Sequence, residues 1–259
     1  MIKIQGTKQK EETYALIASA WDEIEIGESF QIVQSNELGG KSLEKRLGKL
    51  FSQVDAESYD KARHIILTKT KDEPDVLDEW RSYNQLSYCT DIGFYSMPGI
   101  FGWNKIDKGS ELLLTHLSEL KGVGADFGCG YGYLTKHILN TYDKIETLYA
   151  YDIDDRAVMA CGKNIDDPRV IIRQQDCTEI ISGLQKLDFI VMNPPFHDGS
   201  FESKELGQKF IENAARHLKP KGRLWMVANT HLPYEKILAK NFKSFKKIFE
   251  DQGFKIFKT

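Results

Sequence analysis

The chain has 259 residues, of which 41% are hydrophobic and 28% are charged, with a net charge of −3. This composition excludes a disordered chain or a fibre, and the length suits one large α/β domain or an ordinary domain with a smaller partner. No apolar run approaches the roughly 18 residues of a membrane span, and the N-terminal residues lack the apolar core of a signal peptide. We therefore expect a cytoplasmic protein that does not bind a membrane, and we expect a monomer.

Charged residues are unevenly distributed along the chain. Residues 1–90 contain 12 basic and 16 acidic side chains, whereas residues 204–259 contain 13 basic and 5 acidic ones. A basic segment of this kind can bind a polyanion, or it can be the solvated face of a helix. The four cysteines form no C-x-x-C pair, which argues against a zinc site and predicts that no metal is bound.

Residues 1–85 predict a small α/β domain without a recognisable chemical motif. Apolar spacing indicates helices at Glu11–Glu23 and Ser42–Phe51 and one strand at His64–Thr68. The polar stretch Lys71–Asp78, which contains a proline, is typical of a linker. We place the domain boundary after this stretch, so that residues 1–85 form an auxiliary domain and residues 86–259 form the main one.

The main domain alternates short apolar runs with amphipathic stretches, the pattern of a parallel sheet covered by helices on both faces. A helix at Lys108–Leu120 precedes the first strand. The expected strands are Val123–Phe127, Thr147–Asp152, Val170–Gln174, Leu187–Asn193 and Arg223–Asn229, followed by a hairpin of Phe245–Phe249 and Phe254–Phe257. Helices are expected at Leu134–Asn140, Asp155–Lys163, Thr178–Gly183 and Ser203–Leu218, with a tight turn at Pro220–Gly222. Together these elements predict a doubly wound, mostly parallel, seven-stranded Rossmann-like sheet.

A glycine-rich loop follows the first of these strands. Gly128, Gly130 and Gly132 alternate with other residues, and Asp126 precedes them. Glycines at this position let the backbone turn sharply and approach a ligand, beside the free N–H groups of the next helix. A dinucleotide site would require G-x-G-x-x-G, but the spacing here is G-x-G-x-G. The loop resembles motif I of class I methyltransferases that use S-adenosylmethionine (SAM).

Two further carboxylates lie at the ends of strands, the edge at which open α/β sheets bind ligands. Asp152 ends the second strand, where it can accept both hydroxyl protons of a ribose or can cap the next helix. Asp176 follows the third strand and can accept from the adenine amino group or act as an N-cap. We expect both to bind SAM.

The fourth strand runs into the tetrad Asn193-Pro194-Pro195-Phe196. The prolines fix the backbone and hold its carbonyl groups outward as acceptors. If the Asn193 oxygen and the Pro194 carbonyl accept the two N–H bonds of an aromatic amine, its lone pair can point at the methyl group of SAM. Phe196 then provides a surface on which an extruded base stacks. Asn193, Pro194 and Phe196 are the expected catalytic residues, and Asn193 also borders the cofactor.

The tetrad and its continuation His197-Asp198-Gly199 resemble the bacterial ribosomal RNA guanine-N2 methyltransferases, especially the small-subunit methyltransferase C family. The shared stretches lie within residues 90–259 and include Pro98–Phe101, Gly109–Leu114, Val227–Asn229 and Leu232–Tyr234. Phe101 either closes over the methionine end of SAM or is a core aromatic residue. His197 either orients the substrate or packs behind the tetrad, and Asp198 is expected to cap the next segment.

The resemblance implies a SAM-dependent methyltransferase that converts SAM into S-adenosylhomocysteine and modifies ribosomal RNA, free or in an assembled small subunit. It also implies an N-terminal domain that supports RNA binding or folding, although this chain's N-terminal part is shorter than that family's. Two alternatives also fit a planar amino acceptor: a glutamine-N5 protein methyltransferase, which usually has Tyr in place of Phe196, and an adenine-N6 nucleic-acid methyltransferase. A third is an inactive SAM-fold module that binds RNA, in which the motif residues would be degenerate.

Overall fold

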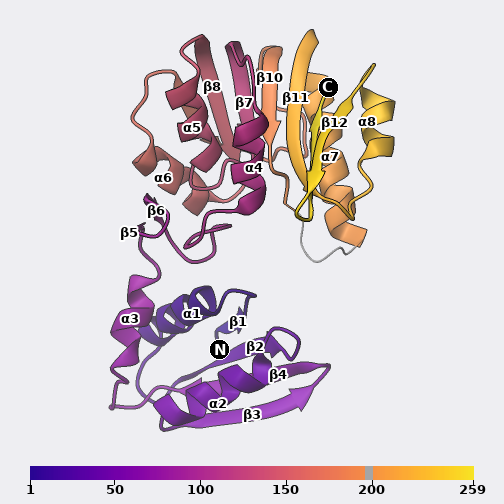
Figure 1. Ribbon diagram of the computed structural model, residues 1–259. Helices are drawn as coiled ribbons and strands as arrows, with labels where there is room; N and C mark the ends of the chain where they lie inside the picture. Colours follow the sequence, from indigo (N-terminus) through magenta and orange to yellow (C-terminus); the bar gives the residue numbers. More distant parts are fainter. Residues whose placement is uncertain (196–200) are drawn as a thin grey trace. The chain divides into compact units, whose positions relative to one another are not determined.

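The computed structural model describes residues 1–195 and 201–259, and of residues 201–204 the backbone alone (Figure 1). The chain divides into two compact units, which are described separately below. One unit comprises Met1–Ser87 with Met97–Gly99, and the other comprises Tyr88–Ser96 with Ile100–Thr259. No helix in the described ranges has the length and apolar character that crossing a membrane requires.

The N-terminal unit packs three helices against a four-stranded sheet in the order β1-β2-β4-β3. The strands are β1 (Lys3–Gln5), β2 (Ser29–Ser35), β3 (Val54–Tyr59) and β4 (Ala62–Thr68), and the helices are α1 (Lys10–Glu23), α2 (Gly40–Leu50) and α3 (Val76–Ser82). Strand β1 is parallel to β2, whereas β4 is antiparallel to both of its neighbours. Phe30 and Ile32 of β2 lie opposite Leu67 and Ile65 of β4, and this apolar face forms one core with the helices.

The C-terminal unit is built on a seven-stranded sheet in the order β12-β13-β11-β10-β7-β8-β9 (Figure 1). Its strands are β7 (Gly122–Phe127), β8 (Ile145–Asp152), β9 (Val170–Gln174), β10 (Leu187–Met192), β11 (Leu218–Asn229), β12 (Lys246–Asp251) and β13 (Phe254–Lys258). Strands β7 to β11 are parallel to their neighbours in that set, and β13 and β12 close one edge as an antiparallel hairpin. The predicted α/β fold with a doubly wound, mostly parallel sheet is confirmed.

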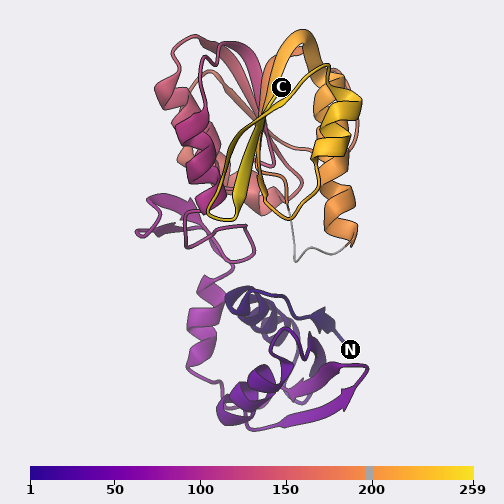
Figure 2. The ribbon, with the colours of Figure 1, turned by 45° about the vertical axis from the view of Figure 1, so that its right-hand side comes forward.

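Helices cover both faces of this sheet (Figure 2). The unit's helices are α4 (Lys108–His116), α5 (Tyr133–Thr141), α6 (Asp155–Asn164), α7 (Phe201–His217) and α8 (Glu235–Asn241). The first three share one buried apolar cluster with the sheet, and α7 and α8 share the other. Strands β5 (Ser87–Cys89) and β6 (Phe94–Ser96) form a separate two-stranded sheet.

The order of the strands places the ligand-binding edge. From β7 the chain moves outward to β8 and β9, and it then returns to the other side of β7 with β10 and β11. The direction therefore reverses between β7 and β10. Open α/β sheets bind their ligands outside the carboxyl ends of the strands at such a reversal.

Two predicted elements are wrong. Residues 178–183 do not form a helix, because α7 side chains bind the backbone within and directly before this segment. Asn213 donates to the Cys177 carbonyl (2.9 Å), and the Ile181 N–H donates to His217 Nε2 (3.1 Å). The segment Pro220–Gly222 lies inside β11 rather than in a turn before it. There it interrupts the register with β10 between the pairs Leu187–Leu218 and Phe189–Arg223.

The sequence also predicted too few elements. In the N-terminal unit it indicated one strand, but the structure has four, together with α3, which begins inside the stretch predicted as a linker. Strand β3 is almost entirely exposed, and β2 carries glutamines among its apolar residues, so neither has a strong apolar pattern. Helix α8 and strands β5 and β6 are short and were not expected.

Candidate active site

The glycine-rich loop joins the carboxyl end of β7 to α5. Gly128, Gly130 and Gly132 all adopt positive φ angles, of 79°, 56° and 94°, which other residues rarely adopt. A Cβ atom at Gly130 would have no described heavy atom within 4 Å, so this residue borders open space. A Cβ at Gly132 would lie 2.9 Å from Cys161 Sγ, so this glycine lets α6 pack closely. The loop therefore has one glycine beside open space, Gly130, and one whose lack of a side chain is required for the packing of α6, Gly132.

Asp152, at the end of β8, fixes the middle of this loop. Its Oδ2 accepts a hydrogen bond from the Gly130 N–H (2.8 Å), and its Oδ1 accepts one from the Asp154 N–H (3.0 Å). Asp154 is the N-cap of α6 and accepts from the Arg156 N–H, so Asp152 has no capping role. Burial raises the pKa of Asp152. Each carboxylate oxygen has a second lone pair with which it can accept a hydroxyl proton.

Asp126 lies beneath the loop and is fully buried. Its Oδ2 accepts a 2.6 Å hydrogen bond from Thr135 Oγ1 of α5, whereas Oδ1 has no hydrogen-bond partner in the described part of the chain. Burial raises the pKa of Asp126 to about 7, and the nearby carboxylate of Asp152 also raises it. An ionised carboxylate in this position is costly unless a donor or a positive charge reaches Oδ1.

Asp176 begins the segment that follows β9. Its Oδ1 accepts from both the N–H and the hydroxyl of Thr178, at 2.8 and 2.7 Å. Asp176 thus caps a local turn, and the helix that it would have capped in the alternative interpretation does not form. Asp152 and Gln174 are register partners at the ends of β8 and β9, so Asp176 follows at the same edge of the sheet.

The tetrad begins where β10 ends. Met192 is the register partner of Phe127, so Asn193 and Gly128 leave adjacent strands at the same level. The Asn193 side-chain nitrogen donates to Asp107 Oδ2 (2.7 Å) and to Ser110 Oγ (2.9 Å). Its oxygen, Oδ1, is buried and has no hydrogen-bond partner among the described residues. Pro194, the next residue, is buried.

Phe196, His197 and Asp198 lie outside the described residues. The side chain of Phe101 is 53% exposed. A Cβ at its neighbour Gly102 would lie 3.8 Å from the Tyr131 ring, so this segment passes the glycine-rich loop. Among the described residues, the loop glycines, Asp126, Asp152 and Asn193 therefore lie at the carboxyl ends of the adjacent strands β7, β8 and β10.

Three residues that support the site were not identified as functional from the sequence. Asp107 is the N-cap of α4 and, with Ser110, binds the Asn193 amide. Asn164, at the end of α6, donates to the carbonyls of Tyr95 (2.8 Å) and Tyr131 (2.9 Å) and accepts from the Tyr95 N–H (2.7 Å). An aspartate directly before a helix is a recognisable N-cap signal, but its bond to a residue 86 positions later has no sequence signature.

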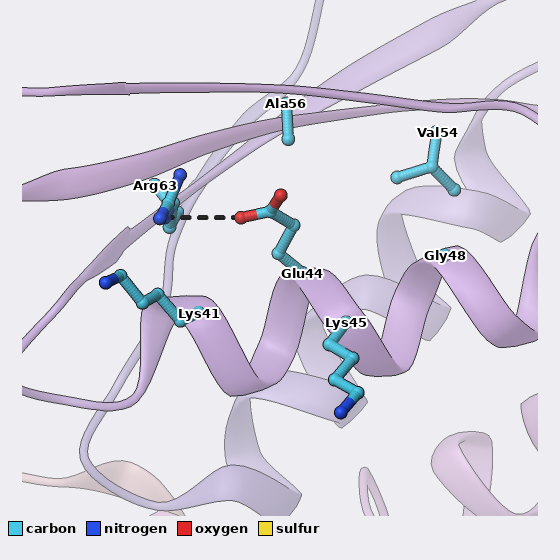
Figure 3. Close-up of a pocket in the computed structure, with 7 residues that line it drawn as sticks. All are labelled: Lys41, Glu44, Lys45, Gly48, Val54, Ala56 and Arg63. Atoms are coloured by element: carbon cyan, nitrogen blue, oxygen red, sulfur yellow. Dashed lines mark ion pairs between the residues drawn. The ribbon is translucent and has the colours of Figure 1, made fainter.

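The N-terminal unit contains a basic groove between α2 and strands β3 and β4 (Figure 3). Its volume is about 520 Å³. The lining residues are Lys41, Glu44, Lys45, Gly48, Val54, Ala56 and Arg63. Arg63 pairs with Glu44 across the groove, with Nε and Oε2 3.2 Å apart. Three cationic side chains and one carboxylate give the groove a positive charge.

Known proteins resemble this chain in sequence and in fold. The family model "Methyltransferase small domain" matches residues 91–258. The ribosomal RNA small subunit methyltransferase C of Shewanella pealeana is 31% identical over 231 residues, which cover 87% of this chain and 67% of the relative. The enzyme of the same name from Shewanella denitrificans is 32% identical over 247 residues, covering 93% and 71%.

The fold resembles that of the T. thermophilus 16S rRNA N2 G1207 methyltransferase, which was solved in complex with AdoMet and guanosine. The TM-score is 0.80, and the match covers 99% of this chain and 71% of that one, at 22% identity. This similarity concerns the fold, whereas the sequence matches extend over the site and most of the chain. On the sequence matches, the chain belongs to the ribosomal RNA small subunit methyltransferase C family.

Proposed function

We propose that this protein transfers the methyl group of SAM to the exocyclic N2 amino group of a guanine in small-subunit ribosomal RNA. The observation that carries the proposal is the buried Asn193 oxygen, which has no partner among the described residues and lies level with the glycine-rich loop. Leaving a buried acceptor unsatisfied is unfavourable, so such an atom is explained when a substrate supplies the donor. An exocyclic amino group is a donor of this kind.

The residues around the loop fit SAM. Gly130 borders open space, and the Asp152 oxygens retain lone pairs with which to accept the ribose hydroxyls. Asp126 Oδ1 and the adenine-side carboxylate Asp176 are further acceptors at this edge of the sheet. When bound, SAM supplies a sulfonium-linked methyl group that an amine can attack, and S-adenosylhomocysteine is left as the product. We assign Asp126, Gly128, Gly130, Gly132, Asp152, Asp176 and Phe101 to its binding.

The chain's own contribution to the reaction is to position the acceptor. An aromatic amine is a weak nucleophile because its lone pair is delocalised into the ring. Asn193 Oδ1 and the Pro194 carbonyl accept its two N–H bonds and hold the nitrogen so that the lone pair is directed at the methyl carbon, while Phe196 stacks on the base. Once it is alkylated, the nitrogen carries a positive charge and its proton becomes acidic. This proton can leave to water, so no strong protein base is required.

The N-terminal unit is proposed to help bind the RNA. The cationic side chains of its groove, Lys41, Lys45 and Arg63, can contact phosphates of the RNA backbone without reading its sequence. The 204–259 segment, with 13 basic and 5 acidic residues, is a second candidate for such contacts. Residues 1–85 are thus an auxiliary domain and residues 86–259 the catalytic domain in this proposal.

The identity of the methyl acceptor is tested by incubating the protein with SAM labelled in the methyl group and with small ribosomal subunits that lack the modification. We expect label in the ribosomal RNA. Label in protein alone would favour a glutamine-N5 methyltransferase, which acts on the same planar amino geometry. A calorimetric titration without SAM binding would instead favour an inactive RNA-binding module.

The roles of Asn193 and Asp152 are separable by substitution. Asn193→Ala should reduce methyl transfer at least ~10²-fold and leave SAM affinity nearly unchanged, because this residue holds the acceptor. Asp152→Ala should weaken SAM binding, because it removes the ribose acceptor and the partner of the Gly130 N–H. Calorimetry with SAM and single-turnover kinetics measure the two effects. Equal losses of SAM affinity in both variants would contradict the assignment.

A further inference from the structure

We propose that Asp107 and Ser110 are positioning residues that hold the Asn193 side-chain amide with its oxygen toward the acceptor amine. The proposal rests on the methyl transfer proposed above, and it identifies what orients the Asn193 oxygen, which accepts a hydrogen bond from the substrate amine. It concerns a part of the site that lies 83 to 86 residues upstream of the tetrad and belongs to a different element, α4.

Among the described residues, the Asn193 amide has hydrogen-bond partners at its nitrogen and none at its oxygen. Asp107 Oδ2 and Ser110 Oγ lie 2.7 and 2.9 Å from Nδ2, so both N–H bonds of this nitrogen are engaged. A carboxylate oxygen only accepts hydrogen bonds, so the amide oxygen cannot occupy the position facing Asp107. The choice between the two amide orientations is therefore fixed by the chemistry of the neighbours and not by the shape of the side chain.

The carboxylate is itself held in place by α4. The same Asp107 Oδ2 that accepts from Asn193 also accepts from the Ser110 N–H (2.7 Å), as the N-cap of the helix. A Cβ at Gly109 would lie 2.9 Å from the Phe254 ring and 3.1 Å from Asp107 Oδ2. Gly109 thus allows the start of α4 to approach β13 and the cap carboxylate closely. Asp107, Ser110 and Gly109 form one rigid support for the amide.

The orientation matters because the two ends of an amide have opposite hydrogen-bonding character. With Nδ2 held by Asp107 and Ser110, Oδ1 faces away from them and can accept from an amine. A flipped amide would point its N–H groups at the N–H groups of the acceptor amine, and its oxygen at the carboxylate. That state cannot hold the amine for attack. Asp107 and Ser110 exclude the flipped amide before any substrate binds. The Asn193 oxygen is thus preorganised to accept from the amine.

Asp107→Asn is the most informative substitution. Asparagine caps a helix about as well as aspartate, so α4 should persist, and the capping oxygen of the new amide can still accept from Asn193 Nδ2. What is lost is the charge of this acceptor, so the preference of the amide at position 193 for one orientation weakens. We expect kcat to fall ~10-fold with SAM affinity unchanged within about 2-fold, and Ser110→Ala to lower kcat by less, ~3-fold, because it removes a neutral acceptor. Asp167→Asn, which removes a carboxylate from the turn before β9, is the matched control and should leave kcat unchanged.

Asn193→Asp tests the donor and acceptor logic, because it replaces the nitrogen that donates to Asp107 by a second acceptor. Two carboxyl groups then face each other, and they tolerate this only while one carries a proton, so activity should fall as pH rises. In the wild type an amide faces Asp107, so its activity should not show this loss. An activity of Asn193→Asp that does not fall with pH relative to the wild type would contradict the role of Asp107 as an acceptor.

Hydrogen exchange of the Asn193 side-chain amide gives a readout that needs no activity. The two Nδ2 proton signals, identified by their absence in Asn193→Asp, should exchange slowly with solvent in the wild-type protein and faster in Asp107→Asn. Slow exchange with no methyl transfer to RNA would sustain the positioning role and reject the proposed function. Unchanged exchange in Asp107→Asn, or an unchanged kcat in an active enzyme, would overturn the positioning role.

Discussion

Asp126 is the most strongly perturbed carboxyl group of the candidate site. It is fully buried, and desolvation raises its pKa to about 7. In the unfolded chain its pKa is near the model-peptide value of about 3.9, so the folded state binds the proton more tightly over the interval between these values. By linkage, the free energy of unfolding is largest at low pH within this window and falls as pH rises toward 7.

Asp126→Asn should remove this dependence. For the protein without SAM, we expect the wild type to lose on the order of 2 kcal/mol of unfolding free energy more than the variant between pH 5 and pH 8. Urea denaturation at several pH values measures the difference, and other titrating groups cancel in the comparison. A wild-type curve that runs parallel to that of Asp126→Asn would mean that Asp126 is ionised throughout this range.

At the scale of elements, Asn164 ties the glycine-rich loop to its surroundings. Its three hydrogen bonds join the end of α6 to β6 and to the Tyr131 carbonyl of the loop. Asn164→Ala leaves these backbone groups without partners, at a cost of about 1 to 3 kcal/mol for each one that remains buried. We expect SAM affinity to fall ~10-fold, as calorimetry would measure.

Asn140→Ala, at an exposed position of α5, is the control and should bind SAM as the wild type does. If Asn164→Ala unfolds too readily for titration, Asn164→Asp retains the acceptor for the Tyr95 N–H and loses the two donors. Unaltered SAM affinity in folded Asn164 variants would show that the glycine-rich loop does not depend on these hydrogen bonds.

The elements that could be predicted from the sequence are those whose pattern is local. Strands β7 to β10 are short, largely apolar runs, and their predicted bounds are within two residues of the observed ones. Residues 178–183 have a helical pattern, but His217 of α7 binds the Ile181 N–H and Asn213 binds the carbonyl of the preceding residue, Cys177. Tertiary contacts of this kind override local propensity and have no signal in the segment itself.

The same distinction applies to the candidate site. The glycines, Asp152 and Asn193 were singled out because each occupies a fixed place beside a strand end. Asp107 acts through a hydrogen bond to a residue 86 positions away. Asn164 acts through hydrogen bonds to residues 33 and 69 positions away. Only the folded chain brings these residues together. The motif therefore indicates the chemistry, and the fold is needed to show what holds the motif in place.

At the scale of the whole molecule, the proposed RNA substrate requires a cationic surface. Reversing two charges of the groove in Lys41→Glu with Lys45→Glu should weaken RNA binding and reduce the steepness with which affinity falls as salt rises, by roughly one to two units of the log–log slope. Fluorescence anisotropy with small-subunit ribosomal RNA at several salt concentrations measures this slope.

The matched control reverses the charges of two exposed lysines of the same unit that lie outside the groove, in Lys3→Glu with Lys10→Glu. Net charge changes equally in both double variants, so a general electrostatic effect would weaken RNA binding in both. Equal slopes in the two would remove the groove from the RNA-binding surface, while SAM affinity should be unaffected in either.

The identity of the methylated nucleoside tests the account most directly. Ribosomal RNA from a strain that lacks the gene is digested to nucleosides and analysed by mass spectrometry, with and without the restored gene. The account predicts that one N2-methylguanosine of the small subunit disappears, and that it returns with the wild-type gene but not with Asn193→Ala. An unchanged N2-methylguanosine content, or the loss of N6-methyladenosine instead, would contradict it.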